Sequence, residues 1–291
     1  MKAITFLFCV LCASCLQAQK FDDVQINTQQ LSDNMYVLFG AGGNIGLLTG
    51  PDGVVMIDAQ FAELSPKIKA VADSLSTTEI RYLVNTHWHG DHTGGNANFA
   101  RYGATIIAHD NVRERLRVDQ IRPFRRSTPA SPEIAWPKLT FNEEMNIHIN
   151  GETMHLIHVH KAHTDGDAFV YLPSQNILHM GDCFFRSRFP YIDLEMGGSY
   201  EGAIAAVEAA LLICDENTQI IPGHGSLSNK QHLSDYLQML KIMKDRVVTS
   251  IDNGVALENA DIAGLTKGFE AWGTGFISPE KFIKMLYASY E

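Results

Sequence analysis

The sequence is poor in basic residues and in cysteine. Its 291 residues include 23 lysines and arginines against 33 aspartates and glutamates, a formal net charge of −10. Because proteins bind nucleic-acid phosphates through basic patches, this acidic balance argues against a nucleic acid as partner. Of the 5 cysteines, three precede residue 16, whereas Cys183 and Cys214 fall in separate later segments. We therefore expect no disulfide framework and interpret both later cysteines as small buried residues.

Long apolar runs are also lacking, except for residues 3–16. This uncharged stretch follows a short positively charged start and ends close to the small residue Ala18. It is too short to span a bilayer, and the arrangement is typical of a secretory signal peptide. The sequence thus predicts a signal peptide over residues 1–18, a periplasmic or secreted mature protein, and no stable membrane insertion after cleavage. Lipoprotein anchoring at Cys15 is an alternative.

A Gly-x-Ser-x-Gly elbow is absent as well, which argues against serine chemistry. What the sequence has instead is a run of three histidines and an aspartate at residues 87–92, His-Trp-His-Gly-Asp-His. The run follows residues 80–85, which are expected to form a buried strand. Side chains on a glycine-bearing loop at a strand end suit a catalytic metal site, which needs an open coordination position. The candidate ligands in this run are His87, His89, Asp91 and His92.

Three further candidate ligands lie later in the chain, each after a short apolar stretch that is expected to be a strand. They are His163, Asp182 and His224, and glycine or small polar residues flank each of them. Three separate strand ends that offer histidine or aspartate in glycine-bearing loops are unusual in a purely structural domain. The sequence therefore predicts one metal centre to which several strand ends contribute.

With these motifs the sequence resembles the metallo-β-lactamase superfamily of zinc hydrolases, over about residues 35–236. The resemblance implies the α/β class, as an αββα sandwich of two mixed β-sheets flanked by helices, in a single domain over residues 19–291. It also implies two Zn²⁺ ions. The implied ligands are His87, His89 and His163 for the first zinc, Asp91, His92 and His224 for the second, and Asp182 as a carboxylate bridging both.

The distribution of β-rich runs agrees with this fold. Runs at residues 35–39, 45–49 and 54–58, separated by glycine turns, predict an initial meander. Ser65-Pro66 is a typical helix start, with serine as the cap and proline in the first turn. Asn150-Gly151 lies between two further β-rich runs and predicts a tight hairpin.

The resemblance implies hydrolysis by a metal-bridging hydroxide, because bound Zn²⁺ lowers the pKa of its water to roughly 7. Asp91 is the expected catalytic residue, which orients the nucleophile and shuttles its proton. The favoured substrate is a small-molecule acyl compound, a cyclic amide or ester such as a β-lactam or a lactone. The alternatives are a glyoxalase II-like thioesterase and a non-catalytic zinc-binding or sensor protein on the same fold. Iron or manganese could replace zinc.

One departure from the cysteine-ligand β-lactamases concerns Cys183. Those enzymes carry a cysteine ligand at the strand end where this sequence reads Gly181-Asp182-Cys183, but they lack a histidine at the position of His92. We therefore predict that Asp182 is the metal ligand and that Cys183 is its apolar neighbour.

Substrate contacts are expected close to Asp182 and on the segment between the first two metal motifs. Arg186 and Arg188 are candidates for binding a substrate carboxylate. Phe185 and Trp136 are candidates for apolar walls of the pocket.

Overall fold

The computed structural model describes residues 21–122 and 127–291. The expected signal peptide, residues 1–18, and the alternative anchor Cys15 lie outside the described residues. Within the described part of the chain, no helix is at once long enough and apolar enough to cross a membrane.

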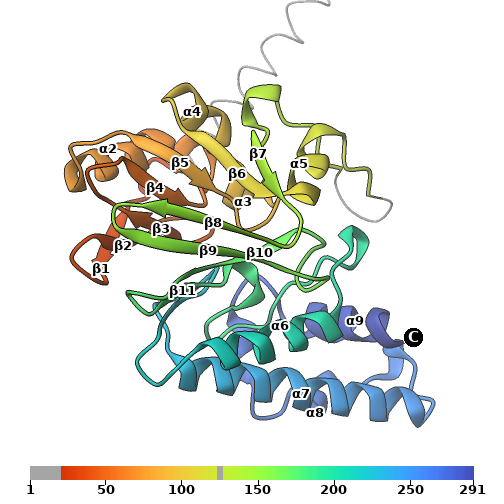
Figure 1. Cartoon of the computed structure of the whole chain (residues 1–291). Coiled ribbons are helices and arrows are strands. Elements are labelled where there is room, and N and C mark those ends of the chain that lie inside the picture. Colours follow the sequence, from red (N-terminus) through yellow and green to blue (C-terminus); the bar gives the residue numbers. More distant parts are fainter. Residues whose placement is uncertain (1–20, 123–126) are drawn as a thin grey trace, which may run out of the picture.

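The first half of the chain forms a seven-stranded sheet in the order β1-β2-β3-β4-β5-β6-β7 (Figure 1). Strands β1 to β4 pair antiparallel and β4 to β7 pair parallel, so the sheet is mixed. The parallel part matters for function, because the carboxyl ends of parallel strands are where binding loops gather. Its strands are β1 (Asn27–Gln30), β2 (Met35–Phe39), β3 (Ile45–Leu48), β4 (Val54–Ile57), β5 (Ile80–Val84), β6 (Thr105–His109) and β7 (Leu139–Phe141).

The second sheet has five strands in the order β12-β11-β10-β9-β8. Only β11 and β12 pair parallel. Asn150 and Gly151 join β8 to β9 with φ values of 55° and 76°, as the left-handed tight turn predicted for this dipeptide requires. The strands are β8 (Glu144–Ile149), β9 (Glu152–Val159), β10 (Asp167–Leu172), β11 (Ile177–His179) and β12 (Gln219–Ile221).

The two sheets pack face to face, and helices cover both outer faces. Val84 of the first sheet and Leu156 and Val170 of the second belong to the same buried apolar cluster between the sheets. Helix α2 (Ser65–Leu75) covers the outer face of the first sheet through Ile68. It starts at Ser65-Pro66, but the predicted serine cap is wrong, because Leu64 is the N-cap and no side chain caps the helix. The outer face of the second sheet packs against α6 (Tyr200–Ile213), α7 (Lys230–Asp252) and α9 (Pro279–Tyr290) (Figure 1). The remaining short helices are α3 (Gly90–Thr93), α4 (Asn96–Arg101), α5 (Asp110–Arg117) and α8 (Ile262–Leu265).

This arrangement confirms the predicted αββα sandwich of two mixed sheets. The initial meander is observed one residue shorter than expected at two of its strands, which end at Leu48 and Ile57. Asp58, the residue after β4, lies outside the strand with a φ of 64°. Its carboxylate accepts a hydrogen bond from the backbone N–H of Thr86, which lies just after β5.

Candidate metal centre

The loop after β5 carries four of the seven predicted ligands. Asn85, the first residue after the strand, is fully buried and pairs its side-chain amide with that of Asn96 at 3.0 and 2.8 Å. Gly90 then starts α3, and Gly94 packs so closely that a Cβ there would lie within 2.9 Å of the Gln60 carbonyl oxygen. The loop is therefore held at both ends by close contacts. At Gly94 these contacts leave no room for a side chain.

The other three ligands come from the second sheet. His163 lies between β9 and β10, Asp182 lies in the turn after β11, and His224 follows β12. A Cβ on Gly223 would overlap Oδ1 of Asp182, so glycine is required where the two turns approach each other. The structure thus brings together all seven predicted ligands, four from the first sheet and three from the second.

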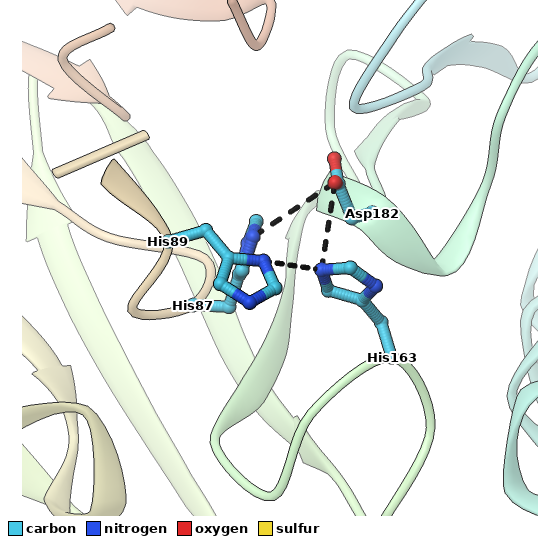
Figure 2. Close-up of side chains that lie close together, drawn as sticks. All are labelled: His87, His89, His163 and Asp182. Atoms are coloured by element: carbon cyan, nitrogen blue, oxygen red, sulfur yellow. Dashed lines mark hydrogen bonds and ion pairs between the residues drawn. The ribbon is translucent and has the colours of Figure 1, made fainter. Parts of the chain in front are cut away.

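The first group of side chains consists of His87, His89, His163 and Asp182, which offer ligand atoms within 4.8 Å of one another (Figure 2). Nδ1 of His89 lies 2.8 Å from Nε2 of His163. Oδ2 of Asp182 lies 3.9 Å from Nε2 of His87 and 3.5 Å from Nε2 of His163.

The second group consists of Asp91, His92 and His224. Oδ2 of Asp91 lies 3.8 Å from Nε2 of His92 and 3.3 Å from Nε2 of His224. The other oxygen of Asp182, Oδ1, lies 3.1 Å and 3.4 Å from the same two nitrogens. Asp182 therefore faces each group with a different oxygen.

These residues fit a metal ion because several of their polar atoms have no other partner. Nε2 of His87, Nε2 of His92 and Oδ1 of Asp182 are buried without a hydrogen bond. Buried polar atoms are almost always hydrogen-bonded, so three such atoms at one point indicate a missing binding partner. Imidazole nitrogens and carboxylate oxygens are the ligands that Zn²⁺ takes in catalytic sites.

In His89, His92 and His163 one ring nitrogen is hydrogen-bonded to a group outside the ligand cluster, here called its outer partner. These bonds orient each ring so that its other nitrogen faces the cluster. Nδ1 of His92 donates to Asp58 at 2.7 Å, and Nδ1 of His163 donates to the Tyr191 carbonyl oxygen at 2.6 Å. Nε2 of His89 donates to Asp193 at 2.8 Å, so in this ring Nδ1 is left for the metal. Such outer partners set the tautomer and orientation of metal-binding histidines.

Asp58 and Asp193 are functional residues that the sequence analysis missed. Asp58 accepts hydrogen bonds from both the backbone N–H and the hydroxyl of Thr86, besides that of His92. The signal that could have revealed it is a carboxylate at the end of a buried strand, where an unpaired charge would be costly. No comparable local signal marks Asp193.

The charges in the cluster favour metal binding. Burial lowers the pKa of His163 to about 4 and that of His87 well below its usual range, so both rings are neutral and able to bind a cation near neutral pH. Burial alone would lower the pKa of His224, but the carboxylates of Asp182 and Asp91 raise it to about 9. In the metal-free protein the protonated ring of His224 thus supplies a positive charge next to the carboxylates of Asp182 and Asp91.

Arg122 completes the support of His89. Its guanidinium lies 2.6 Å from the buried carboxylate of Asp193 and 5.2 Å from the centre of the Trp88 ring. Burial would raise the pKa of Asp193, but the hydrogen bond from His89 and the charge of Arg122 lower it to about 2. Arg122 therefore keeps Asp193 ionised as the acceptor for His89.

We predict that Arg122→Gln and Asp193→Asn each weaken zinc binding by roughly 10–100-fold, the range for losing an outer partner of a ligand histidine. Affinity would be measured by competition with a fluorescent zinc chelator. Arg81→Gln, which changes an exposed arginine of the first sheet, is the matched control. Unchanged zinc affinity in both variants would contradict the assigned role.

A cavity of about 820 Å³ opens over the cluster. Of the four predicted substrate contacts, Phe185 and Arg188 line this cavity, whereas Arg186 and Trp136 are not among its lining residues. The backbone N–H of Arg186 donates to the His224 carbonyl oxygen at 2.9 Å and so fixes the His224 turn. The Trp136 ring packs on the apolar cluster beneath the cavity, and its N–H donates to the Ser131 carbonyl oxygen.

Cys183 does not belong to either group of candidate ligands. Its side chain is 2% exposed and belongs to the core between the second sheet and its helices. Burial raises the pKa of its thiol well above the usual range in the metal-free protein. Asp182, in contrast, lies within the first group, so the choice of Asp182 over Cys183 as the metal ligand stays a prediction.

Comparison with protein families gives one match, over residues 38–224, to the model of the metallo-beta-lactamase superfamily. The match ends at His224 and therefore includes all seven side chains of the cluster. It covers well over half of the chain.

Curated relatives are distant. A 2,4-dinitroanisole O-demethylase subunit alpha of Nocardioides sp. is 26% identical over 47% of this chain and 40% of its own length, so the chain spans less than half of that relative. A hydroxyacylglutathione hydrolase of Pelagibacter ubique is 25% identical over 67% of both chains. A metallo-beta-lactamase type 2 of Bacteroides fragilis is 25% identical over 64% of this chain and 74% of its own.

Among solved structures, a metallo-beta-lactamase from Pontibacter korlensis superposes with a TM-score of 0.60. The superposition covers 75% of this chain and 99% of that chain, at 18% identity. At this identity the similarity establishes the fold alone.

Proposed function

The chain belongs to the metallo-beta-lactamase superfamily, and from this premise we propose that it is an exported dinuclear zinc hydrolase that cleaves a cyclic amide or ester, such as a β-lactam or a lactone. Members of the superfamily are mostly hydrolases, and the His/Asp cluster provides a metal site. In this proposal the substrate is a small molecule and the protein acts in the periplasm or outside the cell.

The observation that carries the proposal is the position of Asp182. One of its carboxylate oxygens faces His87 and His163, and the other faces His92 and His224. A carboxylate shared in this way supports two metal ions side by side, as in sites that clamp both the attacking and the leaving group.

Bound zinc would supply a nucleophilic water of lowered pKa and polarise the carbonyl group of the substrate. The protein's own contribution begins with Asp91, whose side chain is 28% exposed and lines the cavity. Its carboxylate can accept the proton of the attacking water and return it to the leaving group. Phe185, whose ring stacks on that of His224 at 5.5 Å, keeps this side of the site apolar and dry.

The test compares three substrates with the purified zinc-loaded protein: a chromogenic β-lactam, a lactone and a thioester, each with and without a chelator. Chelator-sensitive turnover of the β-lactam or the lactone is the expected result. Asp91→Asn should lose turnover, because the amide cannot accept the proton and is a weaker zinc ligand than the carboxylate. Bound zinc with no hydrolysis of any acyl substrate would instead support a non-catalytic zinc-binding or sensor protein. Loading with iron or manganese in parallel would reveal a different preferred metal.

A thioesterase of the glyoxalase II type is the second candidate. It is favoured by the similarity to a hydroxyacylglutathione hydrolase over two thirds of both chains. Turnover confined to the thioester would establish it and exclude the first candidate.

A further inference from the structure

The cavity over the ligand cluster is large for the chemistry at a single acyl group. Its volume of about 820 Å³ lies towards the upper end of the roughly 300–1,000 Å³ typical of ligand pockets. His89, Asp91, Asp182 and His224 account for only a part of its lining. Most of the cavity is therefore available to the part of the substrate that does not react. The chemistry of the lining residues indicates the chemistry of that part.

One wall is apolar and comes from the C-terminal segment. Phe276 and Ile277 follow the short helix at Glu270–Thr274 and line the cavity together with Phe185 and Phe189. Phe276 is 78% exposed, so its ring is accessible to a molecule in the cavity. Both C-terminal residues lie outside residues 38–224, so this wall is an addition to the part of the chain that matches the family.

The wall is held in place before any substrate binds. The backbone N–H of Phe189 donates to the Trp272 carbonyl oxygen at 3.0 Å, and the Phe189 ring stacks on Phe282 of α9 at 4.3 Å. The Lys281 ammonium group lies 5.1 Å from the centre of the Phe276 ring. An aromatic surface that is both exposed and fixed binds an apolar group without the cost of ordering a loop.

The same wall carries a positive charge. Among residues 21–122 and 127–291, three arginines line the cavity, and two of them are neutralised: Arg115 by Asp165 and Arg122 by Asp193, both at 2.6 Å. The third, Arg188, forms no ion pair with any carboxylate of residues 21–122 and 127–291.

The Arg188 side chain lies beside the exposed phenylalanine. Its Cδ would be 3.2 Å from a Cβ built on Gly275, the residue before Phe276. A guanidinium group presents a planar fork of donors that matches a carboxylate or another oxyanion. The rim of the cavity thus offers one apolar contact and one anion contact next to each other.

We propose that the substrates of this protein are amphiphilic anions: acyl compounds with a large apolar group that packs on Phe276 and Ile277 and an anionic group that Arg188 binds. The inference rests on the proposed hydrolase function and specifies its substrate class. It makes the C-terminal segment around Phe276 a specificity-determining element.

The test is a fluorescence titration of the zinc-loaded protein with parinaric acid, a fluorescent long-chain fatty acid, and with its uncharged methyl ester. Phe276→Ala should weaken binding of both probes by about tenfold, because each loses the same apolar contact. Arg188→Gln should weaken binding of the acid by about tenfold and leave the ester unchanged. Both positions are exposed, so neither substitution disturbs the core.

Matched controls are Leu212→Ala, an 89% exposed leucine on α6, and Arg101→Gln on α4, neither of which lines the cavity. Wild-type affinity of the Phe276 and Arg188 variants for both probes would overturn the inference. So would equal losses in the control variants.

Probe binding needs no turnover, so the two proposals can fail separately. Binding that depends on Phe276 and Arg188 without hydrolysis of any acyl substrate would refute the hydrolase and leave the binding site. Hydrolysis combined with probe binding that is indifferent to both residues would refute the amphiphile inference alone.

Discussion

Replacing Asp182 with alanine is expected to reduce hydrolysis by roughly 10³-fold or more. Loss of a residue that only hydrogen-bonds to a metal ligand already costs about 10–100-fold in metal affinity or activity, and loss of a ligand itself should cost more. The carboxylate lies 3.1–3.9 Å from four histidine nitrogens of both groups. In the proposed dinuclear site its removal would take a ligand from each metal and leave the positive charges of the two ions without the carboxylate between them. Zinc content should therefore fall from two ions per chain to one or fewer, as measured by mass spectrometry of metals after dialysis.

Asp235→Ala is the matched control, because this exposed aspartate lies on α7 and its side chain accepts a hydrogen bond from the exposed Gln231. Its zinc content and turnover should equal those of the wild type. An Asp182→Ala protein that retained two zinc ions would show that the carboxylate is not shared between them.

Removal of the metal is expected to lower the melting temperature by on the order of 10 °C. A ligand present at a thousand times its dissociation constant stabilises the folded state by ~4 kcal/mol. In a domain of this size each kcal/mol corresponds to about 2–4 °C. The measurement is a calorimetric scan of the zinc-loaded protein with and without a chelator at neutral pH.

The gap between the two forms should widen as the pH rises from 7 to 9. The pKa of His224 in the metal-free fold is raised from 6.5 to about 9, so protonation of this ring stabilises the fold fully below pH 6.5. That stabilisation disappears as the pH rises through about 9, and the chelated protein melts earlier. Asp182→Ala, which lacks the shared ligand, should respond to the chelator only weakly. A chelator effect of equal size in this variant would mean that the effect does not arise at the cluster.

The clustering of the seven candidate ligands could be predicted from the sequence because each lies in a locally recognisable motif. Residues 87–92 hold four of them in one loop, and the other three follow short apolar strands with glycine beside them. Gly223 shows why the glycines carry information, since no other residue fits against Asp182. Strand ends and tight turns can be recognised in a sequence because they are determined by residues that are adjacent in the chain.

The outer partners could not be predicted in this way. Asp58 is 34 residues from His92, and Asp193 is 104 residues from His89. Nothing in the local sequence of either aspartate shows which ring it meets, because the contact exists only once the strands are packed. The Phe276 wall was missed for the same reason: it reaches the cavity through the packing of α9 and Trp272 against the second sheet.

The division of the ligands between the two sheets has a consequence for folding kinetics. A metal ion cannot bind all its ligands until the loop after β5 and the turns after β9, β11 and β12 have met, which happens only when the sheets are docked. Contacts that form after the transition state slow unfolding and leave the folding rate nearly unchanged. A metal ion bound across the two sheets would therefore slow the unfolding of the protein and change its folding rate little.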